Sequence, residues 1–431
     1  METLKNVSFK PISQSFYYKP ILMKYLQDGQ EKSYEIAEKH SSVAILLYHT
    51  GLQKFLVVRQ FRPPIFVNRV RKMAENHGKS LSEIQWEDYD AELGYTVELC
   101  AGMVDKDKSL EQIASEEIME ECGFSAKAEE LLKIEASIYD LGSSGVTHNV
   151  YYVEVDDTRK IGEGGGNQNE QESITKVFLT LEEAEALSGC SPPGFSFAFA
   201  WWKNRNRDLK ATSEPVLANK MREKVPNRMT NFSFTRDGFP KRDELLKAHF
   251  RLGRITRAWD LALRNDCVSV LLYLTDSEEV IFLKRFRPAA AIGRMRAKRE
   301  NYGKKLEEID LDLYHDDYAV TLEPMCTKLT QGETPQDAAI RAVLSQSGYK
   351  ISNPEFIKEF IIGISMGGDM MKLYFAEATA RDIDPNFRER EDTTVLHLPK
   401  ACLPELALYT EPLGPPILYY SAYYLLERLV W

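Results

Sequence analysis

The sequence is short of cysteine, of long apolar runs and of positive charge, and each shortage excludes a class of protein. Its 6 cysteines are scattered, with no Cys-x-x-Cys pair and no Cys/His cluster, so neither a disulfide framework nor a zinc site is predicted. No stretch reaches the roughly 18 apolar residues of a membrane-spanning helix, and Met1 to Asn6 lacks the apolar run of a signal peptide. We therefore expect a cytoplasmic protein with no membrane partner.

Lysine and arginine total 55 against 65 aspartates and glutamates, a formal net charge of -10. Nucleic-acid binding normally needs a basic surface, so no nucleic-acid partner is expected, although a local basic cleft can still hold phosphates. Hydrophobic residues make up 43% of the 431 positions. That share is enough to form hydrophobic cores, and the length predicts about two or three domains.

What the sequence does contain is a second copy of itself. Phe61-Arg62-Pro63 recurs as Phe286-Arg287-Pro288, a shift of 225 positions, and the same shift relates Gly78-Lys79 to Gly303-Lys304. After a two-residue deletion the shift becomes 223 and relates two Pro-Pro pairs, at 192 and 415. We predict a first copy at 1–205, a polar linker at 206–230 and a second copy at 231–431.

Within the first copy, short β-branched runs alternate with helical stretches, which is typical of an α+β domain. The predicted strands are Val43–Tyr48, Phe55–Val58, Val150–Val155 and Lys176–Leu179, the first two forming a hairpin across the turn at 49–51. The predicted helices are Ser109–Glu121 and Leu181–Leu187. The apolar segment Pro415–Trp431 is interrupted by Glu427 and Arg428, which predicts an amphipathic helix packed on its domain.

One predicted helix is acidic. Ser109 followed by Gln112 forms a capping box and Gly123 is a C-terminal stop, so the helix is expected from about Leu110 to Cys122. Glu117, Glu120 and Glu121 stand at i, i+3 and i+4, which gathers three carboxylates on one face. Such oxygen ligands suit Mg²⁺ or Mn²⁺; the alternative interpretation is a solvated acidic face.

The surrounding pattern resembles the box of the Nudix hydrolases. The positions that match the box are Gly102, Glu117, Ile118, Glu120, Glu121, Gly123 and Phe124. Lys108 stands where that family has Glu, and Glu116 stands where it has Arg. We interpret this as a charge exchange, in which the two residues keep an ion pair with reversed signs.

Further motifs, Gln60-Phe61-Arg62-Pro63 and Thr96-Val97-Glu98-Leu99-Cys100-Ala101-Gly102, look like the UDP-sugar diphosphatase branch, close to the ADP-ribose pyrophosphatases. The resemblance implies two tandem Nudix-type α/β/α sandwich domains with mixed β-sheets, each preceded by N-terminal strands. It also implies Mg²⁺-dependent hydrolysis, with Mn²⁺ as an alternative metal. The substrate would be a nucleoside diphosphate sugar of the UDP-glucose or ADP-ribose type, giving a nucleoside monophosphate and a sugar phosphate.

The same resemblance implies the site residues. The metal ligands are Glu117, Glu120, Glu121 and the carbonyl oxygen of Ala101, and Glu120 and Glu121 also count as catalytic. Arg62 is a candidate clamp on the diphosphate, the alternative being an ion pair with a surface acid, and Glu98 either touches substrate or is only solvated. The general base is assigned to Glu172, with Glu170 in reserve, in a Gly-rich loop whose alternative interpretation is plain flexibility.

The second copy keeps the helix signals but has Ala342, Ser345 and Gln346 in place of the three glutamates. We predict that it is non-catalytic, since three neutral side chains cannot hold Mg²⁺ in the family manner. It is expected to form an intramolecular pseudo-dimer with the first copy, offering Arg287 or the strands near Asn231 to the catalytic half, so that the chain is a monomer. The competing hypothesis is a protein that binds or senses a nucleotide sugar without cleaving it.

Overall fold

The computed structural model describes residues 2–12, 15, 18–27, 29–166, 173–207, 209, 216–223, 229–238, 244–314, 316–409 and 411–430. In the first copy, seven strands form one mixed sheet in the order β10-β5-β4-β9-β8, with β6 paired to β5 and β7 paired to β4. These strands are β4 (Ser42–His49), β5 (Lys54–Phe61), β6 (Tyr95–Glu98), β7 (Cys100–Met103), β8 (Leu132–Ile138), β9 (Thr147–Val155) and β10 (Ile174–Leu179).

The predicted hairpin is confirmed, since β4 runs antiparallel to β5 with Leu47 opposite Leu56. β4 is parallel to β9, which makes the sheet mixed. The second copy repeats the arrangement in the order β16-β15-β14-β19-β18, with β17 paired to β14 and β20 to β15. Its strands are β14 (Cys267–Leu274), β15 (Glu279–Phe286), β16 (Val320–Glu323), β17 (Met325–Lys328), β18 (Glu355–Ile361), β19 (Met370–Ala378) and β20 (Thr393–Pro399).

Each sheet is covered by helices on both faces, because its central strands are apolar on both faces. Successive residues of a strand point to opposite sides. Ile45 and Leu47 therefore pack with helix α2 (Leu110–Glu117), and Leu46 packs with helix α4 (Pro193–Asn204). The layers confirm the predicted α/β/α sandwich. The remaining helices are α1 (Pro63–Arg71), α3 (Leu181–Ala186), α5 (Val216–Arg222), α6 (Pro288–Arg296), α7 (Pro335–Ser347), α8 (Leu403–Ala407) and α9 (Pro416–Leu429).

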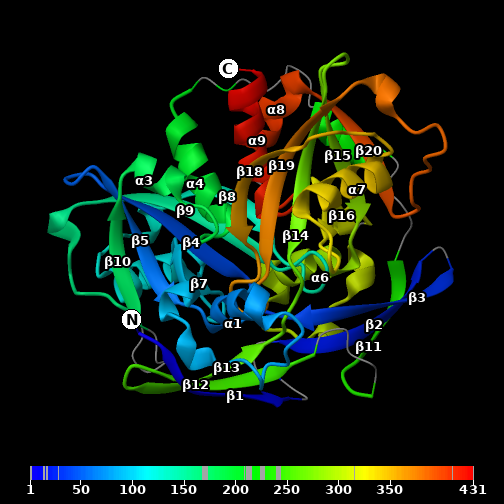
Figure 1. Cartoon of the computed structure of the whole chain (residues 1–431). Coiled ribbons are helices and arrows are strands. Elements are labelled where there is room, and N and C mark those ends of the chain that lie inside the picture. The colour runs from blue at the N-terminus through cyan, green and yellow to red at the C-terminus, as the bar shows by residue number, and fades with distance from the viewer. Residues whose placement is uncertain are drawn as a thin grey trace.

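The two copies share one hydrophobic core around α4 and α9, which lie together between the two sheets (Figure 1). The ring of Phe197 lies 6.1 Å from that of Tyr419 and 6.0 Å from that of Tyr423. α9 is the predicted terminal helix: its apolar face is buried, while Glu427 and Arg428 are exposed. No helix of the described residues combines the length and apolarity needed to cross a membrane.

The N-terminal strands are exchanged between the copies. β1 of the first copy pairs with β12 of the second in the sheet β1-β12-β13, and β11 of the second pairs with β2 of the first in the sheet β11-β2-β3. Both three-stranded sheets lie along the lower edge in Figure 1. The strands are β1 (Leu4–Pro11), β2 (Lys19–Gln27), β3 (Gln30–Glu38), β11 (Met229–Thr235), β12 (Leu246–Leu252) and β13 (Ile255–Leu261).

Each hairpin also covers the other copy. Phe250 of β12 packs on Phe61 and Phe66 of the first copy, and Ile21 and its neighbours on β2 and β3 pack on Ile292 of α6 in the second. The two copies are thus interlocked through their N-terminal strands. Helix α5 and the start of β11 lie within the predicted linker range 206–230.

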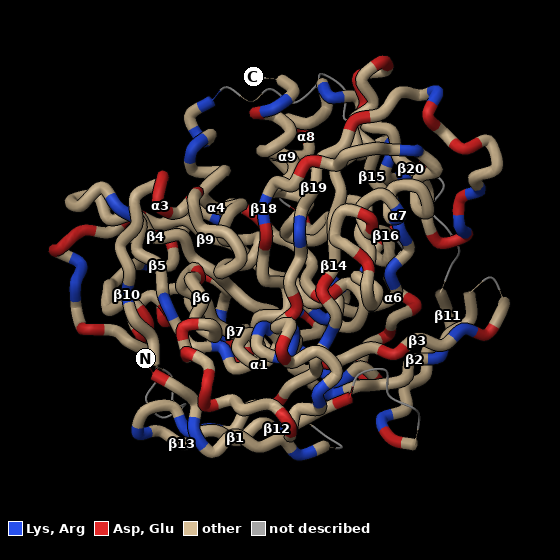
Figure 2. Tube along the Cα trace, in the orientation of Figure 1, with Lys and Arg blue, Asp and Glu red and all other residues tan. Residues whose placement is uncertain are grey.

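Charged residues of both signs alternate along the trace in Figure 2, and several pairs join the copies. Asp140 of the first copy accepts from Lys39 at 2.7 Å and from Arg264 of the second copy at 3.1 Å. Burial alone would raise the pKa of Asp140, but these two cations overcome it and lower the pKa well below its ordinary value. This ion pair therefore stabilises the docking of the copies at neutral pH.

Candidate active site

The acidic helix begins as predicted. The Ser109 hydroxyl accepts from the Gln112 N–H at 3.2 Å, and the Gln112 side chain accepts from the Ser109 N–H at 3.0 Å. The helix also ends at Cys122, before Gly123 in the left-handed conformation, as predicted, but its last turn from Ile118 to Cys122 is π-helical, whereas the α-helical part stops at Glu117. α7 passes through the same place in the second copy as a regular α-helix. The wider turn carries Glu120 and Glu121, and such turns are frequent at functional sites.

Two of the three glutamates meet strand β7. A Cβ atom on Gly102 would lie 2.0 Å from Oε1 of Glu117, so a larger residue there would force that carboxylate to move. Glu121 is 4% exposed, and its Oε2 accepts from the backbone N–H of Ala101 at 3.0 Å. Glu120 is half-buried. The structure thus brings Ala101 and Gly102 together with Glu121 and Glu117, two of the three carboxylates predicted from the helix spacing.

Carboxylate and carbonyl oxygens are the donors that Mg²⁺ and Mn²⁺ take. The side chains of Glu117 and Glu121 and the carbonyl of Ala101 are oxygen donors of this kind, so their chemistry fits a hard divalent cation. Within the described ranges, no three His, Cys, Asp or Glu side chains are drawn together tightly enough to form a metal cage. Like charges at this spacing repel one another, and we expect the carboxylates to converge only around a cation.

The residues that depart from the box are paired. Lys108 Nζ forms an ion pair with Oε1 of Glu116, and Lys106 Nζ lies 3.2 Å from Oε2 of the same carboxylate. The hydrogen bond to Glu116 raises the pKa of Lys106, and Glu120 and Glu117 raise it further. The predicted Lys108–Glu116 contact is therefore confirmed. Lys106 was not singled out from the sequence, and its only signal is its place just before the acidic helix.

Arg62 and Glu98 hold each other. Arg62 donates from Nε and Nη2 to the two carboxylate oxygens at 2.8 and 2.7 Å, and Thr96 donates to the same carboxylate at 2.5 Å. Glu98 is 6% exposed, so of the alternatives for Arg62 the structure shows an ion pair, with a buried rather than a surface acid. Thr96 was missed, although its i, i+2 spacing from Glu98 on one strand places both side chains on one face.

Arg287 lies in the second copy and is held there. It donates to both oxygens of Glu323 at 2.7 Å, the arrangement that Arg62 and Glu98 have in the first copy. Its role toward the catalytic half stays a prediction. Another cation of the second copy, Arg257 on β13, lies near Tyr95 of the first: burial raises the pKa of Tyr95, and Arg59 and Arg257 oppose the rise.

The predicted bases, Glu172 and Glu170, lie outside the described residues. The start of their loop is described and is tied to the acidic helix. The N–H of Gly165 donates to the carbonyl of Glu121 at 2.9 Å, and the N–H of Gly166 donates to that of Glu120 at 3.1 Å. A Cβ on Gly164, at φ +64°, would lie 2.4 Å from the Glu121 carbonyl oxygen. The glycines therefore allow the loop to approach the glutamates closely.

In the second copy an arginine lies against the residue that replaces Glu121. Arg285 Nη2 donates to Oε1 of Gln346 at 2.6 Å, while Gln346 Nε2 donates to the carbonyl of Cys326 at 2.8 Å. Arg341 donates to both oxygens of Glu333 at 2.6 and 2.8 Å. A fixed positive charge beside a neutral amide opposes binding of a divalent cation there.

Known proteins resemble this chain over the length of one copy. No family model matches it. It is 30% identical over 212 residues to the uridine diphosphate glucose pyrophosphatase NUDT14 of Mus musculus, covering 47% of this chain and 95% of that protein. It is 27% identical over 157 residues to the GDP-mannose pyrophosphatase of Cronobacter sakazakii, covering 36% of this chain and 65% of that protein. A solved structure of an ADP compounds hydrolase aligns with 42% of this chain and 80% of its own, at 16% identity and a TM-score of 0.27.

Proposed function

The chain belongs to the Nudix hydrolases, and from that premise we propose that its first copy hydrolyses the diphosphate bond of a nucleoside diphosphate sugar. The products are a nucleoside monophosphate and a sugar phosphate. The observation that carries this proposal is the seating of Glu117 over Gly102 and of Glu121 on Ala101 in the first copy. The names of the two pyrophosphatase relatives support the substrate class, and the proposed substrates are of the UDP-glucose or ADP-ribose type.

The proposed metal is Mg²⁺, with Mn²⁺ as the alternative. Glu117, Glu120, Glu121 and the carbonyl oxygen of Ala101 would hold it, because hard cations take oxygen ligands. When bound, such a cation neutralises phosphate oxygens and lowers the pKa of a water molecule that attacks phosphorus.

The chain's own residues have separate proposed roles. Glu172 takes the proton of the attacking water, and the hydrogen bonds of Gly165 and Gly166 support this by holding the start of its loop at the acidic helix. Arg62 orients the diphosphate, and Glu98 acts as a positioning residue because its two oxygens hold the guanidinium in one orientation.

The second copy has a structural role in this proposal. It is non-catalytic, and its hairpin β12–β13 covers Phe61 and Phe66, which flank Arg62 along the chain. We propose that the chain works as a monomer, because strand exchange is already complete within it.

Product analysis tests the function. The full chain and Glu121→Gln are incubated with UDP-glucose, ADP-ribose and GDP-mannose, each with and without Mg²⁺, and nucleoside monophosphate is measured. We expect metal-dependent release that Glu121→Gln abolishes. Glu333→Gln makes the same chemical change in the second copy, just before helix α7. It is the matched control and should retain activity. A wild-type chain that binds these nucleotides without releasing a monophosphate would instead favour a non-catalytic binding or regulatory protein.

A further inference from the structure

Two cysteines meet in the second copy at the place that corresponds to the proposed metal site of the first. Cys326 on β17 is related to Ala101 by the 225-residue shift, and Cys267 begins β14. Ser269 of β14 stands opposite Cys326, and alternate residues of a strand share a face, so Cys267 faces the same side as Cys326. The two thiols are hydrogen-bonded to each other. Cys267 is buried, whereas Cys326 is partly exposed.

Arg285 is held beside Cys326 by an acceptor that the two residues share. Oε1 of Gln346 accepts from Arg285 Nη2 at 2.6 Å and from the N–H of Cys326 at 3.2 Å. Gln346 Nε2 in turn donates to the carbonyl of Cys326 at 2.8 Å. Nε of Arg285 is buried and has no hydrogen-bond partner within the described part of the chain. The guanidinium thus lies close to the cysteine and keeps one donor unused, whereas the first copy has the neutral Gln60 at the related position.

The groups around Cys326 favour its thiolate form. Two arginines share one carboxylate, since Glu323 accepts from Arg287 at 2.7 Å and lies 3.5 Å from Arg285. The hydrogen bond from Cys267 lowers the pKa of Cys326, and the two arginines lower it further, while burial and Glu323 oppose them only in part. The same hydrogen bond raises the pKa of Cys267. Cys267 therefore keeps its proton and acts as the donor.

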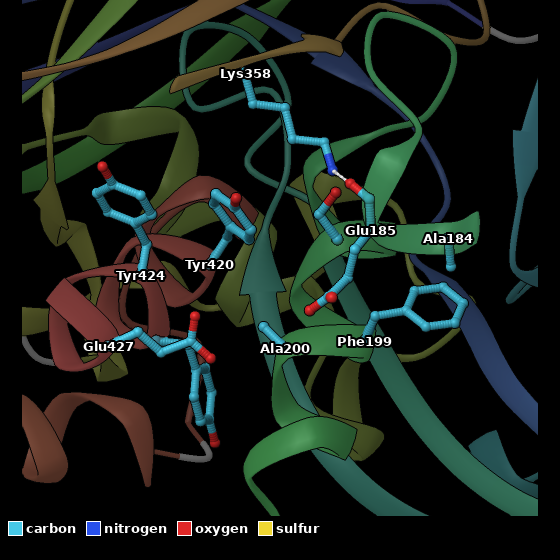
Figure 3. Close-up of a pocket in the computed structure, with 10 residues that line it drawn as sticks. Ala184, Glu185, Phe199, Ala200, Lys358, Tyr420, Tyr424 and Glu427 are labelled. Carbon is cyan, nitrogen blue, oxygen red and sulfur yellow. Dashed lines mark hydrogen bonds between the residues drawn. The ribbon is translucent and has the colours of Figure 1, made fainter. Parts of the chain in front are cut away.

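Cys190 shows that nearby cations alone do not have this effect. It is also partly exposed, and Arg69 and Lys358 act on it, but burial raises its pKa. Lys358 lies at a space between α3 and α4 of the first copy and β18 and α9 of the second, where its Nζ donates to the carbonyl of Glu185 at 3.0 Å (Figure 3). No second thiol donates to Cys190 among the described residues. The donating thiol therefore distinguishes Cys326.

We propose that Cys326 is a modification site, at which a hydroperoxide oxidises the thiolate to a sulfenic acid, with Cys267 and Arg285 as positioning residues. The sulfur attacks one peroxide oxygen, so that the S–O bond forms as the O–O bond breaks. With hydrogen peroxide the second oxygen leaves as hydroxide, which takes a proton and becomes water. The sulfur loses two electrons, which the peroxide gains. A partly exposed thiolate beside arginines and a second thiol is the kind that oxidises most readily.

Peptide mass spectrometry of the full chain tests the site. The folded protein is treated with hydrogen peroxide for increasing times, the remaining thiols are alkylated after denaturation, and the loss of free thiol is followed at each cysteine. We expect the thiol of Cys326 to be lost at least about tenfold faster than that of Cys190, the control within the same molecule. Dimedone added with the peroxide should label Cys326 and so identify the sulfenic acid. A disulfide between Cys326 and Cys267 supports the same step, because a sulfenic acid condenses with a thiol by releasing water.

Three variants test the positioning residues. Cys267→Ser copies the residue at the related position of the first copy and keeps a donor, so Cys326 should oxidise at close to the wild-type rate. Cys267→Ala removes the donor, and Arg285→Gln, which also copies the first copy, removes the charge; each should slow the loss of the Cys326 thiol about tenfold. The proposal is overturned if Cys326 of wild type is oxidised no faster than Cys190, or if Cys267→Ala and Arg285→Gln both react as wild type does. It does not depend on the proposed hydrolysis, because Glu121→Gln should oxidise as wild type does.

Discussion

In the first copy, Lys108 and Glu116 form the ion pair that Glu333 and Arg341 form in the second, with the two charges exchanged. In each copy this ion pair joins the helix, α2 in the first copy and α7 in the second, to the loop that precedes it. In the first copy the helix residue is negative and stands next to Glu117, which adds to the repulsion among the glutamates. Lys106 and Lys108 together offset that added charge.

The first prediction concerns this pair. Lys108→Glu and Glu116→Arg each set like charges against each other, and the double variant restores an opposite pair. Because both side chains are partly exposed, we expect a coupling energy of about 0.2–1 kcal/mol in urea unfolding, with partial recovery of kcat/KM in the double variant. Losses that simply add would show that the two residues act independently.

The second prediction uses the second copy as a guide to Glu121. Gln346 occupies the related position and bonds both the N–H and the carbonyl of Cys326, so an amide is compatible with this place in the fold. Glu121→Gln should therefore melt within a few degrees of wild type and lose at least about 100-fold in kcat/KM, a change of about 2.7 kcal/mol. Thermal unfolding and product release measure the two quantities. Unchanged turnover would remove Glu121 from the proposed site.

The third prediction concerns Gly102. Its Cβ in Gly102→Ala would meet the Glu117 carboxylate at 2.0 Å, so this carboxylate has to move. We expect a large loss of activity that is partly recovered at higher Mg²⁺ or Mn²⁺ concentration. Gly142→Ala is the matched control, since nothing lies within 4 Å of the added methyl group there. Equal activity of the two variants would contradict the seating of Glu117.

The fourth prediction concerns pH. Glu135 is fully buried, neither carboxylate oxygen has a hydrogen-bond partner among the described residues, and burial raises its pKa to about 8. The unfolded side chain titrates near pH 4.3, so the folded protein keeps a proton that the unfolded chain releases between these values. The contribution of Glu135 to stability is therefore complete below about pH 4 and is lost as the pH rises to about 8.

Urea unfolding of wild type and Glu135→Gln at several pH values from about 5 to 9 measures this dependence. The free energy of unfolding of wild type should fall more steeply with pH than that of Glu135→Gln. Above pH 8 the variant should be the more stable protein. Parallel curves would show that Glu135 does not retain a proton in the folded state.

The fifth prediction concerns assembly. β1 already pairs with β12 and β11 with β2 inside one chain, so no partner chain is needed to complete these sheets. Light scattering coupled to size-exclusion chromatography should give a mass near 49.4 kDa. A chain cut after residue 205 lacks the hairpin that covers Phe61 and Phe66, and should aggregate. A stable dimer of the full chain would contradict the proposed monomer.

Much of the site was predictable because its signals are local. The capping box of Ser109 and Gln112 spans three residues, and the spacing of Glu117, Glu120 and Glu121 predicts a common face from the helical repeat. The predicted hairpin rests on two β-branched, apolar runs separated by a short turn. The widening of the helix into a π-helical turn had no such signal, since the sequence around Ile118 reads as ordinary helix.

Contacts between distant residues were less accessible. The pair of Arg62 and Glu98 spans 36 positions, and the hydrogen bond from Arg285 to Gln346 spans 61. The sequence shows where the arginines stand, but it does not show which of several distant polar residues each arginine contacts. The space lined by α3 and α4 of the first copy and β18 and α9 of the second depends on both halves, and no pattern near any one of these elements indicates it.

The sequence by itself determined that the chain is a duplicated α+β protein whose first copy alone carries three glutamates on one helix face, because repeats, caps and periodicity are written in adjacent residues. Only the tertiary structure decided which copy each N-terminal strand joins, which carboxylate holds each arginine and where a space remains between α4 and α9. The two copies have similar strands that can pair within or between copies, and the choice follows from long-range packing of both halves together.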